Sequence, residues 1–124
     1  LYATVASFAA VKQSAIIEAN FPSQYATPRL HELQEKYDFI PIQIRCITQG
    51  DVLLERFTAR AHTAHRHPGH RDKESVEEWK KTLLTGTIEP LDLGVPVFDV
   101  DTTDFSCVDY DAITKHITTQ MQSA

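Results

Sequence analysis

Hydrophobic and polar positions follow two different periods along this chain. In some stretches apolar residues recur every three or four positions, which is typical of an amphipathic helix. In others they recur at every second position or form a short apolar run, which is typical of a strand. The helical period predicts helices over residues 1–12, 28–37, 51–61, 74–84 and 109–121. The strand period predicts strands over residues 15–19, 39–48 and 95–100.

Helices and strands therefore alternate along the sequence. This order predicts an α/β fold in which a parallel sheet is covered by helices on both faces. Between the third and fourth helices, residues 64–72 break the pattern around Pro68-Gly69, which predicts a loop. The sequence contains no internal repeat and no linker-like segment, so we expect residues 1–124 to form a single domain.

The same pattern predicts which side chains are buried. The strand over residues 39–48 has the clearest alternation, with inward positions at Ile40, Ile42, Ile44 and Cys46. We expect Trp79 to be a core residue of its helix. Cys46 and Cys107 lie in or next to apolar segments, so both are expected to be buried free thiols. Pro28 is expected in the first turn of its helix, where its missing N–H costs little.

Composition places the chain among ordinary globular proteins. Hydrophobic residues make up 42% and charged residues 23% of its 124 positions, which argues against disorder, a collagen-like repeat or a disulfide-built miniprotein. The longest apolar runs are a few residues long, so no membrane span is expected. No signal peptide is visible. With two cysteines and no secretory signal, the expected location is the cytoplasm.

Charge is unevenly distributed. The formal net charge is −5, which argues against nonspecific nucleic-acid binding. Five of the twelve Lys and Arg residues nevertheless lie between Arg56 and Lys73, where only Asp72 opposes them. This basic stretch predicts either an anion site or a solvated helix end. Four histidines in it could also indicate zinc, but neighbouring arginines repel a cation and the usual cysteine or carboxylate framework is missing. They are His62, His65, His67 and His70.

Polar residues follow the predicted strands, where open parallel sheets bind their ligands. Thr48 with Gln49 marks the end of the second strand, and Asp101 with Thr102 and Thr103 the end of the third. Glu18, close to Asn20, marks the end of the first. The Glu18 carboxylate could hold a magnesium-bound water or accept a substrate proton. The alternative is that Glu18 is simply a solvated strand end.

Two segments resemble the lid region of small bacterial P-loop kinases. These are Leu53–Ala61, which contains Arg56 and Arg60 four residues apart, and Arg66–Asp72, which contains His-Pro-Gly-His. The group is usually labelled AAA-family ATPases or predicted kinases. Gluconate kinases, chloramphenicol phosphotransferases and zeta-toxin-like kinases are more distant relatives. Residues 16–20 are similar to a strand end of this superfamily, and residues 97–104 to its last strand and adenine-side loop.

The resemblance implies a three-layer P-loop fold and ATP-dependent phosphoryl transfer to a hydroxyl of a small molecule, with Mg²⁺ as cofactor. A lid over residues 60–73 would close on the ATP phosphates. The implied catalytic residues are Glu18, Arg60 and Arg66. The implied phosphate-lid residues are Arg56, Arg71, His67 and His70. Thr102 and Thr103 would line the adenine side, and Asn20 and Arg29 the substrate side. Alternatively, Arg29 is part of an ordinary amphipathic-helix surface.

The sequence departs from this family in one respect, because it contains no G-x-x-x-x-G-K-[ST] motif. The resemblance places the first strand and its phosphate loop between the strand that ends at Glu18 and the one that ends at Thr48. We therefore expect residues before Leu1 to supply them, and residues 1–124 alone to be incomplete and inactive. The alternatives are a non-catalytic module of kinase ancestry that binds a nucleotide, another anion or a partner, and a zinc module built on the four histidines.

Overall fold

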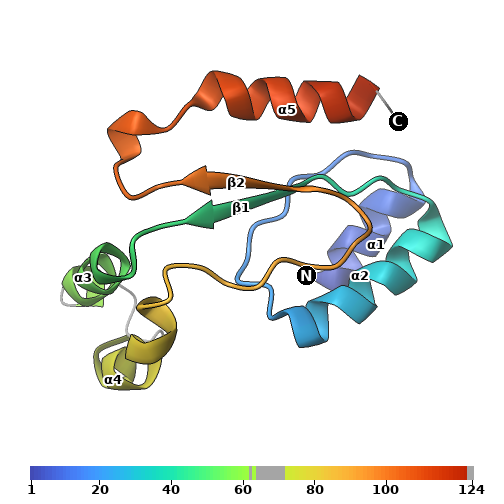
Figure 1. The fold of residues 1–124 in the computed structure, drawn as a ribbon. Helices are drawn as coiled ribbons and strands as arrows, with labels where there is room; N and C mark the ends of the chain where they lie inside the picture. Colours follow the sequence, from blue (N-terminus) through green and yellow to red (C-terminus); the bar gives the residue numbers. More distant parts are fainter. Residues whose placement is uncertain (62, 64–71, 123–124) are drawn as a thin grey trace. The chain divides into compact units, whose positions relative to one another are not determined.

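The computed structural model describes residues 1–61, 63 and 72–122 (Figure 1). These residues form two compact units. The first contains Leu1–Arg45, Glu89–Phe98 and Tyr110–Ala124, and the second contains Cys46–Ile88 and Asp99–Asp109. The expectation of a single domain stays a prediction.

Two strands form the sheet in the described part of the chain. They are β1 (Gln43–Ile47) and β2 (Val97–Asp101), which are hydrogen-bonded neighbours. Both arrows in Figure 1 run in the same direction, so the pair is parallel, and two helices separate the strands in sequence. The mixed α/β class is thus confirmed, whereas the three-layer arrangement stays a prediction. β1 begins four residues later than expected, after Pro41, which has no N–H to donate to a neighbouring strand.

The strand predicted over residues 15–19 is absent, and that prediction is wrong for the described structure. The Ile16 side chain is 98% exposed and that of Ile17 is 37% exposed. A strand needs a hydrogen-bonded neighbour, and no segment among the residues described here pairs with this one. The apolar run therefore lies uncovered at the surface.

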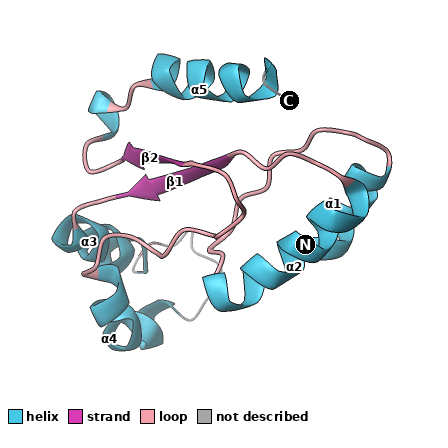
Figure 2. Cartoon of the chain, turned by 45° about the vertical axis from the view of Figure 1, so that its right-hand side comes forward, coloured by secondary structure: helices cyan, strands magenta, loops and turns pink. Residues whose placement is uncertain are grey.

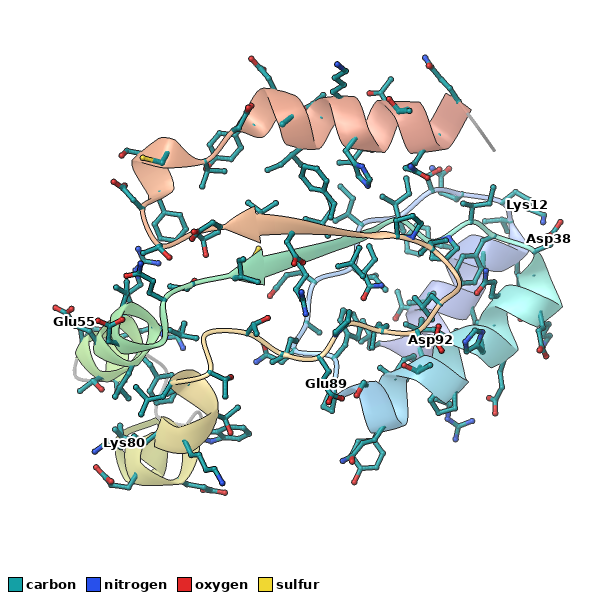
Figure 3. The ribbon with its side chains drawn as sticks, viewed as in Figure 1. Lys12, Asp38, Glu55, Lys80, Glu89 and Asp92 are labelled. Carbon is teal, nitrogen blue, oxygen red and sulfur yellow. The ribbon has the colours of Figure 1, made fainter. Side chains whose placement is uncertain are left out.

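The core of the first unit is formed by α2 (Ser23–Tyr37) and the segment before β2. Ala26 and Leu30 of α2 pack against Leu91 and Leu93. α1 (Tyr2–Ala10) packs along α2 and adds Tyr2 to this cluster. At the C-terminal end of α2, the Lys12 ammonium donates hydrogen bonds to the carbonyls of Tyr37 (2.6 Å) and Asp38 (3.3 Å). Figure 3 shows Lys12 and Asp38 close together. This ammonium satisfies carbonyls that the end of a helix leaves without intrahelical partners.

The position of Pro28 within α2 differs from the prediction. The helix begins at Ser23, so Pro28 lies in its interior rather than in its first turn. The amides of Tyr25 and Ala26 donate to the Pro22 carbonyl at 3.0 and 2.9 Å, which starts the helix before Pro28. Burial of Ala26 and Leu30 on either side of the proline offsets the hydrogen bond that Pro28 cannot make.

The last helix, α5 (Tyr110–Gln122), also belongs to the first unit. The imidazole of His116 stacks on the Phe98 ring of β2, with ring centroids 4.5 Å apart. This stacked pair fixes which face of the helix meets the strand.

The second unit contains α3 (Gly50–Ala61), α4 (Asp72–Leu83) and the short 3₁₀ helix η2 (Phe105–Cys107), and α3 packs against α4 (Figure 2). Two glycines allow backbone to pass close to backbone near the start of α3. A Cβ at Gly50 would overlap the Leu84 carbonyl, and a Cβ at Gly86 would overlap the Thr48 carbonyl. Gly86 also has a φ of 71°, and its carbonyl accepts a 2.9 Å hydrogen bond from the Thr48 amide. Both positions therefore require glycine.

Several residues predicted to be buried are exposed. Trp79 is 48% exposed, because α3 is the helix that packs against α4 and it covers one side of it. Cys46 and Cys107 are exposed free thiols, so the prediction of buried thiols is wrong. Cys46 lies on the outward side of β1, with Ile44, which is 37% exposed. Each of these side chains has too few described neighbours to be covered.

None of the described helices has the length and apolar character needed to cross a bilayer.

Candidate functional site

The ends of β1 and β2 are joined by a network of hydrogen bonds in the second unit. The Thr102 amide donates to the Ile47 carbonyl at 2.8 Å, and the Thr102 hydroxyl donates to the same carbonyl at 2.9 Å. The hydroxyls of Thr48 and Thr102 lie 2.7 Å apart. Thr102 is buried. Its hydroxyl is therefore committed to joining the two strand ends.

The residues after Thr102 continue the network. The Thr103 hydroxyl accepts a 2.9 Å hydrogen bond from the Gln49 amide. The Thr103 amide donates to the Asp101 carboxylate at 2.8 Å. Hydrogen bonds from the Thr103 side chain and backbone hold the pKa of Asp101 below its ordinary value. We call residues 102–105 the β2 turn.

Arg56, on α3, contacts the β2 turn. Its Nη1 donates to the Thr102 carbonyl and its Nη2 donates to the Thr103 carbonyl, each at 2.7 Å. The guanidinium carbon also lies 4.4 Å from the centre of the Phe105 ring. The sequence did not identify Phe105 as part of the site, and its position directly after Asp104 gave no signal for this contact. Arg56 thus binds the backbone of the turn through both terminal nitrogens of its guanidinium.

Asp104 orders the short helix that follows the turn. Its carboxylate accepts hydrogen bonds from the Ser106 amide at 2.9 Å and from the Ser106 hydroxyl at 2.7 Å. These two bonds, the hydroxyl's first, hold the pKa of Asp104 below its ordinary value, and the charge of Arg56 adds a smaller effect in the same direction. Asp104 is therefore the N-cap of η2.

Arg60 lies one turn further along α3 and has different surroundings. It is exposed, and its guanidinium lies 5.5 Å from the centre of the Phe57 ring. It forms no salt bridge with a carboxylate among the described residues. The resemblance implies a catalytic role for Arg60 and a phosphate-lid role for Arg56, and the structure gives the two side chains different contacts. The other expected lid residues, Arg66, His67, His70 and Arg71, lie outside the described residues.

The remaining candidates belong to the first unit. Glu18 and Asn20 are exposed, and neither has a hydrogen-bond partner in the described part of the chain. Arg29 forms a 3.0 Å ion pair with Glu32 one turn along α2, and both side chains are 64% exposed. This pair fits the alternative of an amphipathic-helix surface for Arg29. The structure thus brings Arg56, Thr102 and Thr103 together, and it places Glu18, Asn20 and Arg29 in the other unit.

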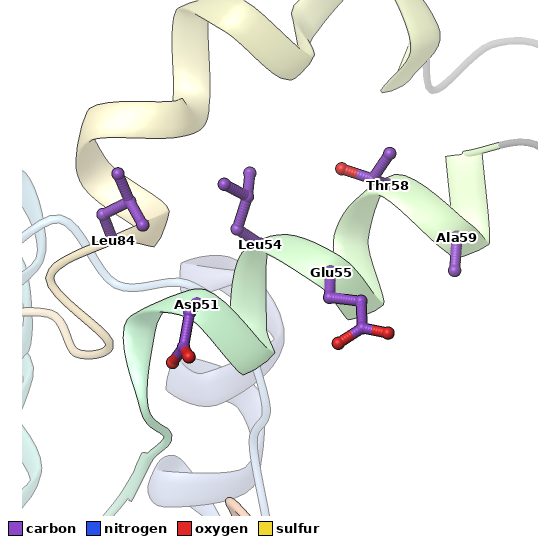
Figure 4. Close-up of a pocket in the computed structure, with 6 residues that line it drawn as sticks. All are labelled: Asp51, Leu54, Glu55, Thr58, Ala59 and Leu84. Atoms are coloured by element: carbon purple, nitrogen blue, oxygen red, sulfur yellow. The ribbon is translucent and has the colours of Figure 1, made fainter.

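An open hollow of about 470 Å³ lies beside α3 and contains none of the candidates. Figure 4 shows the side chains of Leu54 and Leu84 next to each other, with the carboxylates of Asp51 and Glu55 directed away from them. The lining residues are Asp51, Leu54, Glu55, Thr58, Ala59 and Leu84. Because its polar groups do not converge, this hollow lacks the features of a site for a charged ligand.

Metal-ligating side chains do not gather in the described ranges, which contain no group of three or more His, Cys, Asp or Glu placed to hold an ion. The four histidines of the zinc alternative, His62, His65, His67 and His70, lie outside those ranges.

Comparison with solved structures shows a clear similarity. A crystal structure of a protein from Chloroflexus aurantiacus J-10-fl, described as a "putative kinase", is 38% identical to this chain with a TM-score of 0.78. The similarity covers 98% of this chain and 63% of that one, so this chain spans less than two thirds of its length. No protein-family model matches the chain, and no curated protein matches it. The similarity supports a kinase-like α/β fold.

Proposed function

We propose that the protein transfers a phosphoryl group from ATP to a hydroxyl of a small molecule. The observation that carries this proposal is the 38% identity, over 98% of the chain, to the Chloroflexus aurantiacus protein described as a "putative kinase". The polar network at the carboxyl ends of β1 and β2 supports it, because α/β proteins bind their ligands at this edge of the sheet.

Arg60 is the described residue that best suits the ATP phosphates. Its guanidinium is exposed and has no described carboxylate to neutralise it, so its donors are available to phosphate oxygens. We assign it to charge stabilisation during transfer, together with Arg66 and Arg71 of the lid segment. His67 and His70 would complete that lid. The β2 turn would face the adenine through its backbone and the Thr103 side chain. The Thr102 hydroxyl is not available for this, since it already donates a hydrogen bond within the protein.

Glu18 suits a place beside a magnesium ion. Mg²⁺ in phosphoryl-transfer sites is usually held by one or two carboxylates together with phosphates and waters, and the Glu18 carboxylate is exposed without a described partner. When bound, Mg²⁺ with ATP supplies the phosphoryl group in a partly neutralised form. Glu18 would orient the acceptor hydroxyl or hold its proton, and Asn20 and Arg29 would contact the rest of the acceptor.

A further strand and a phosphate-binding loop, supplied by residues outside 1–124, are part of the proposal. Two observations support them. Ile16 is 98% exposed in a segment that pairs with nothing described, and β1 has β2 as its one described neighbour. A strand between the segment at residues 15–19 and β1 would pair with both and cover Ile16.

The proposal is tested by ATP binding and turnover in the presence of Mg²⁺, with the full protein and three variants. Arg60→Ala and Arg66→Ala should lower turnover on the order of 10- to 1,000-fold, because each removes charge stabilisation from the transition state. Lys115→Ala removes one exposed charge from α5 and is the matched control, with turnover expected to stay at the wild-type value. Unchanged turnover in both arginine variants would remove their assigned role. Absence of ATP binding by the wild-type protein would overturn the proposal and favour a non-catalytic interaction module.

A further inference from the structure

We propose that Arg56 is a positioning residue that fixes the shape of the β2 turn and thereby sets the preference of the site between nucleobases. This inference rests on the proposed function for its second half only. Its first half, the clamp on the turn, depends only on the contacts of Arg56 and applies whatever ligand the protein binds.

The geometry of the clamp favours an arginine over a lysine. The carbonyls of Thr102 and Thr103 belong to consecutive residues, and each accepts a 2.7 Å hydrogen bond from a different guanidinium nitrogen. A lysine ammonium would have to reach both carbonyls from one nitrogen, as Lys12 does to Tyr37 and Asp38 at unequal distances of 2.6 and 3.3 Å, so it would hold the turn less firmly. The Phe105 ring, 4.4 Å from the guanidinium, holds it from a third direction. The guanidinium is thus held by three contacts at the charged end of the side chain, which restricts its rotamers.

The clamp adds α3 to a turn that β1 already holds. Thr48 contacts Thr102 and the Gln49 amide donates to Thr103, so the two residues after β1 fix the hydroxyl side of the turn. Arg56 fixes its carbonyl side. Since Thr102 and Thr103 have both their hydroxyls and their carbonyls hydrogen-bonded within the protein, any surface that the turn presents to a ligand keeps a fixed backbone shape. Such a surface discriminates between bases by fit, which loosening the turn would weaken.

The first experiment measures amide hydrogen exchange at Gln49 and Thr102 in the protein without ligand. Arg56→Gln and Arg56→Lys should each accelerate exchange of the Gln49 amide by roughly fivefold or more, because local opening of the turn becomes easier. Arg60→Gln, the same change one helical turn away, is the matched control and should exchange as the wild type does. Arg56→Lys keeps the charge, so it remains informative if Arg56→Gln fails to fold. Wild-type exchange in both Arg56 variants would overturn the clamp.

The second experiment measures the ratio of the dissociation constants of ATP and GTP by calorimetry. Arg56→Gln should move this ratio toward one by roughly tenfold, which corresponds to about 1.4 kcal/mol of lost discrimination. Arg60→Gln should weaken both nucleotides alike and leave the ratio unchanged. An equal loss for both nucleotides in Arg56→Gln would overturn the specificity role. If the wild-type protein binds neither nucleotide, the proposed function fails, and the exchange experiment still decides the clamp.

Discussion

Gln43 pairs with the backbone of Leu91 through both atoms of its side-chain amide. Its Nε2 donates to the Leu91 carbonyl at 2.9 Å, and its Oε1 accepts from the Leu91 amide at 2.7 Å. The side chain thereby makes the two hydrogen bonds that a neighbouring strand would make. Leu91 belongs to the core cluster, so this pair ties the segment before β2 to β1 and holds that segment against α2.

Replacement of Gln43 by Leu is expected to lower the free energy of unfolding by about 1–3 kcal/mol, because the buried Leu91 amide and carbonyl lose their partners. Urea unfolding followed by circular dichroism measures this loss. Gln24→Ala, at an exposed position of α2, is the control and should change stability by no more than about 0.5 kcal/mol. Equal effects of the two substitutions would contradict a stabilising role for the Gln43 pair.

Gly86 and Gly94 form a natural comparison, because their φ angles are 71° and 69°. A Cβ at Gly94 would meet nothing within 4 Å, whereas one at Gly86 would overlap the Thr48 carbonyl. Gly94→Ala should therefore cost only the left-handed backbone strain, about 1–2 kcal/mol. Gly86→Ala should cost roughly 1–3 kcal/mol more, because the backbone must move. Thermal unfolding of the two variants measures the difference, and equal melting temperatures would refute the close approach.

The hydrogen bonds that Asp104 accepts from Ser106 predict a pH dependence. They lower the pKa of this carboxyl in the folded protein, so their contribution to stability is complete above the ordinary carboxyl pKa of about 3.9. That contribution is lost as the pH falls through the lowered pKa. In an NMR titration, Ser106→Ala should raise the pKa of Asp104 toward its ordinary value, since the Ser106 hydroxyl is the largest cause of the shift. Asp101, whose pKa is lowered by Thr103, should be unaffected and serves as the internal control.

The exposed Ile16 tests the proposed additional strand. If that strand covers it in the full protein, Ile16→Asp should lower the free energy of unfolding by roughly 1.5–3 kcal/mol, the value of a buried aliphatic side chain. Gln13→Asp places the same charge at an exposed polar position of the same segment and should have little effect. A loss below about 0.5 kcal/mol in both variants would show that Ile16 stays at the surface and would argue against the strand.

The sequence predicted the helices well, because helix signals are local. The helices expected over residues 1–12 and 109–121 are observed at Tyr2–Ala10 and Tyr110–Gln122. The prediction of a strand over residues 15–19 was wrong, because a strand depends on hydrogen bonds to neighbouring strands. A short apolar run does not reveal whether such neighbours exist. The prediction that Trp79 and Cys46 are buried was wrong for a similar reason. Periodicity shows which face of an element is apolar, and only tertiary packing decides whether that face is covered.

The candidate site shows the same limit. The sequence placed Arg56 and Arg60 on one face of a helix and assigned both to phosphates, because residues four apart are neighbours on a helix. The contact of Arg56 with the Thr102 carbonyl spans 46 residues of sequence. Backbone carbonyls are present at every position, so the residue type at position 102 could not predict that its carbonyl accepts this hydrogen bond. The role of Arg60 stays a prediction, as do those of Glu18, Arg66 and the remaining lid residues.

The close backbone approaches at Gly50 and Gly86 have an evolutionary consequence. Each glycine faces the carbonyl of a segment next to the other: Gly50 meets Leu84, two residues before Gly86, and Gly86 meets Thr48, two residues before Gly50. A larger residue at either position would push apart the two backbone segments, residues 48–50 and 84–86, whose close approach the other glycine also permits. The two sites should therefore mutate together or not at all, and homologues that have lost one glycine should also have lost the other.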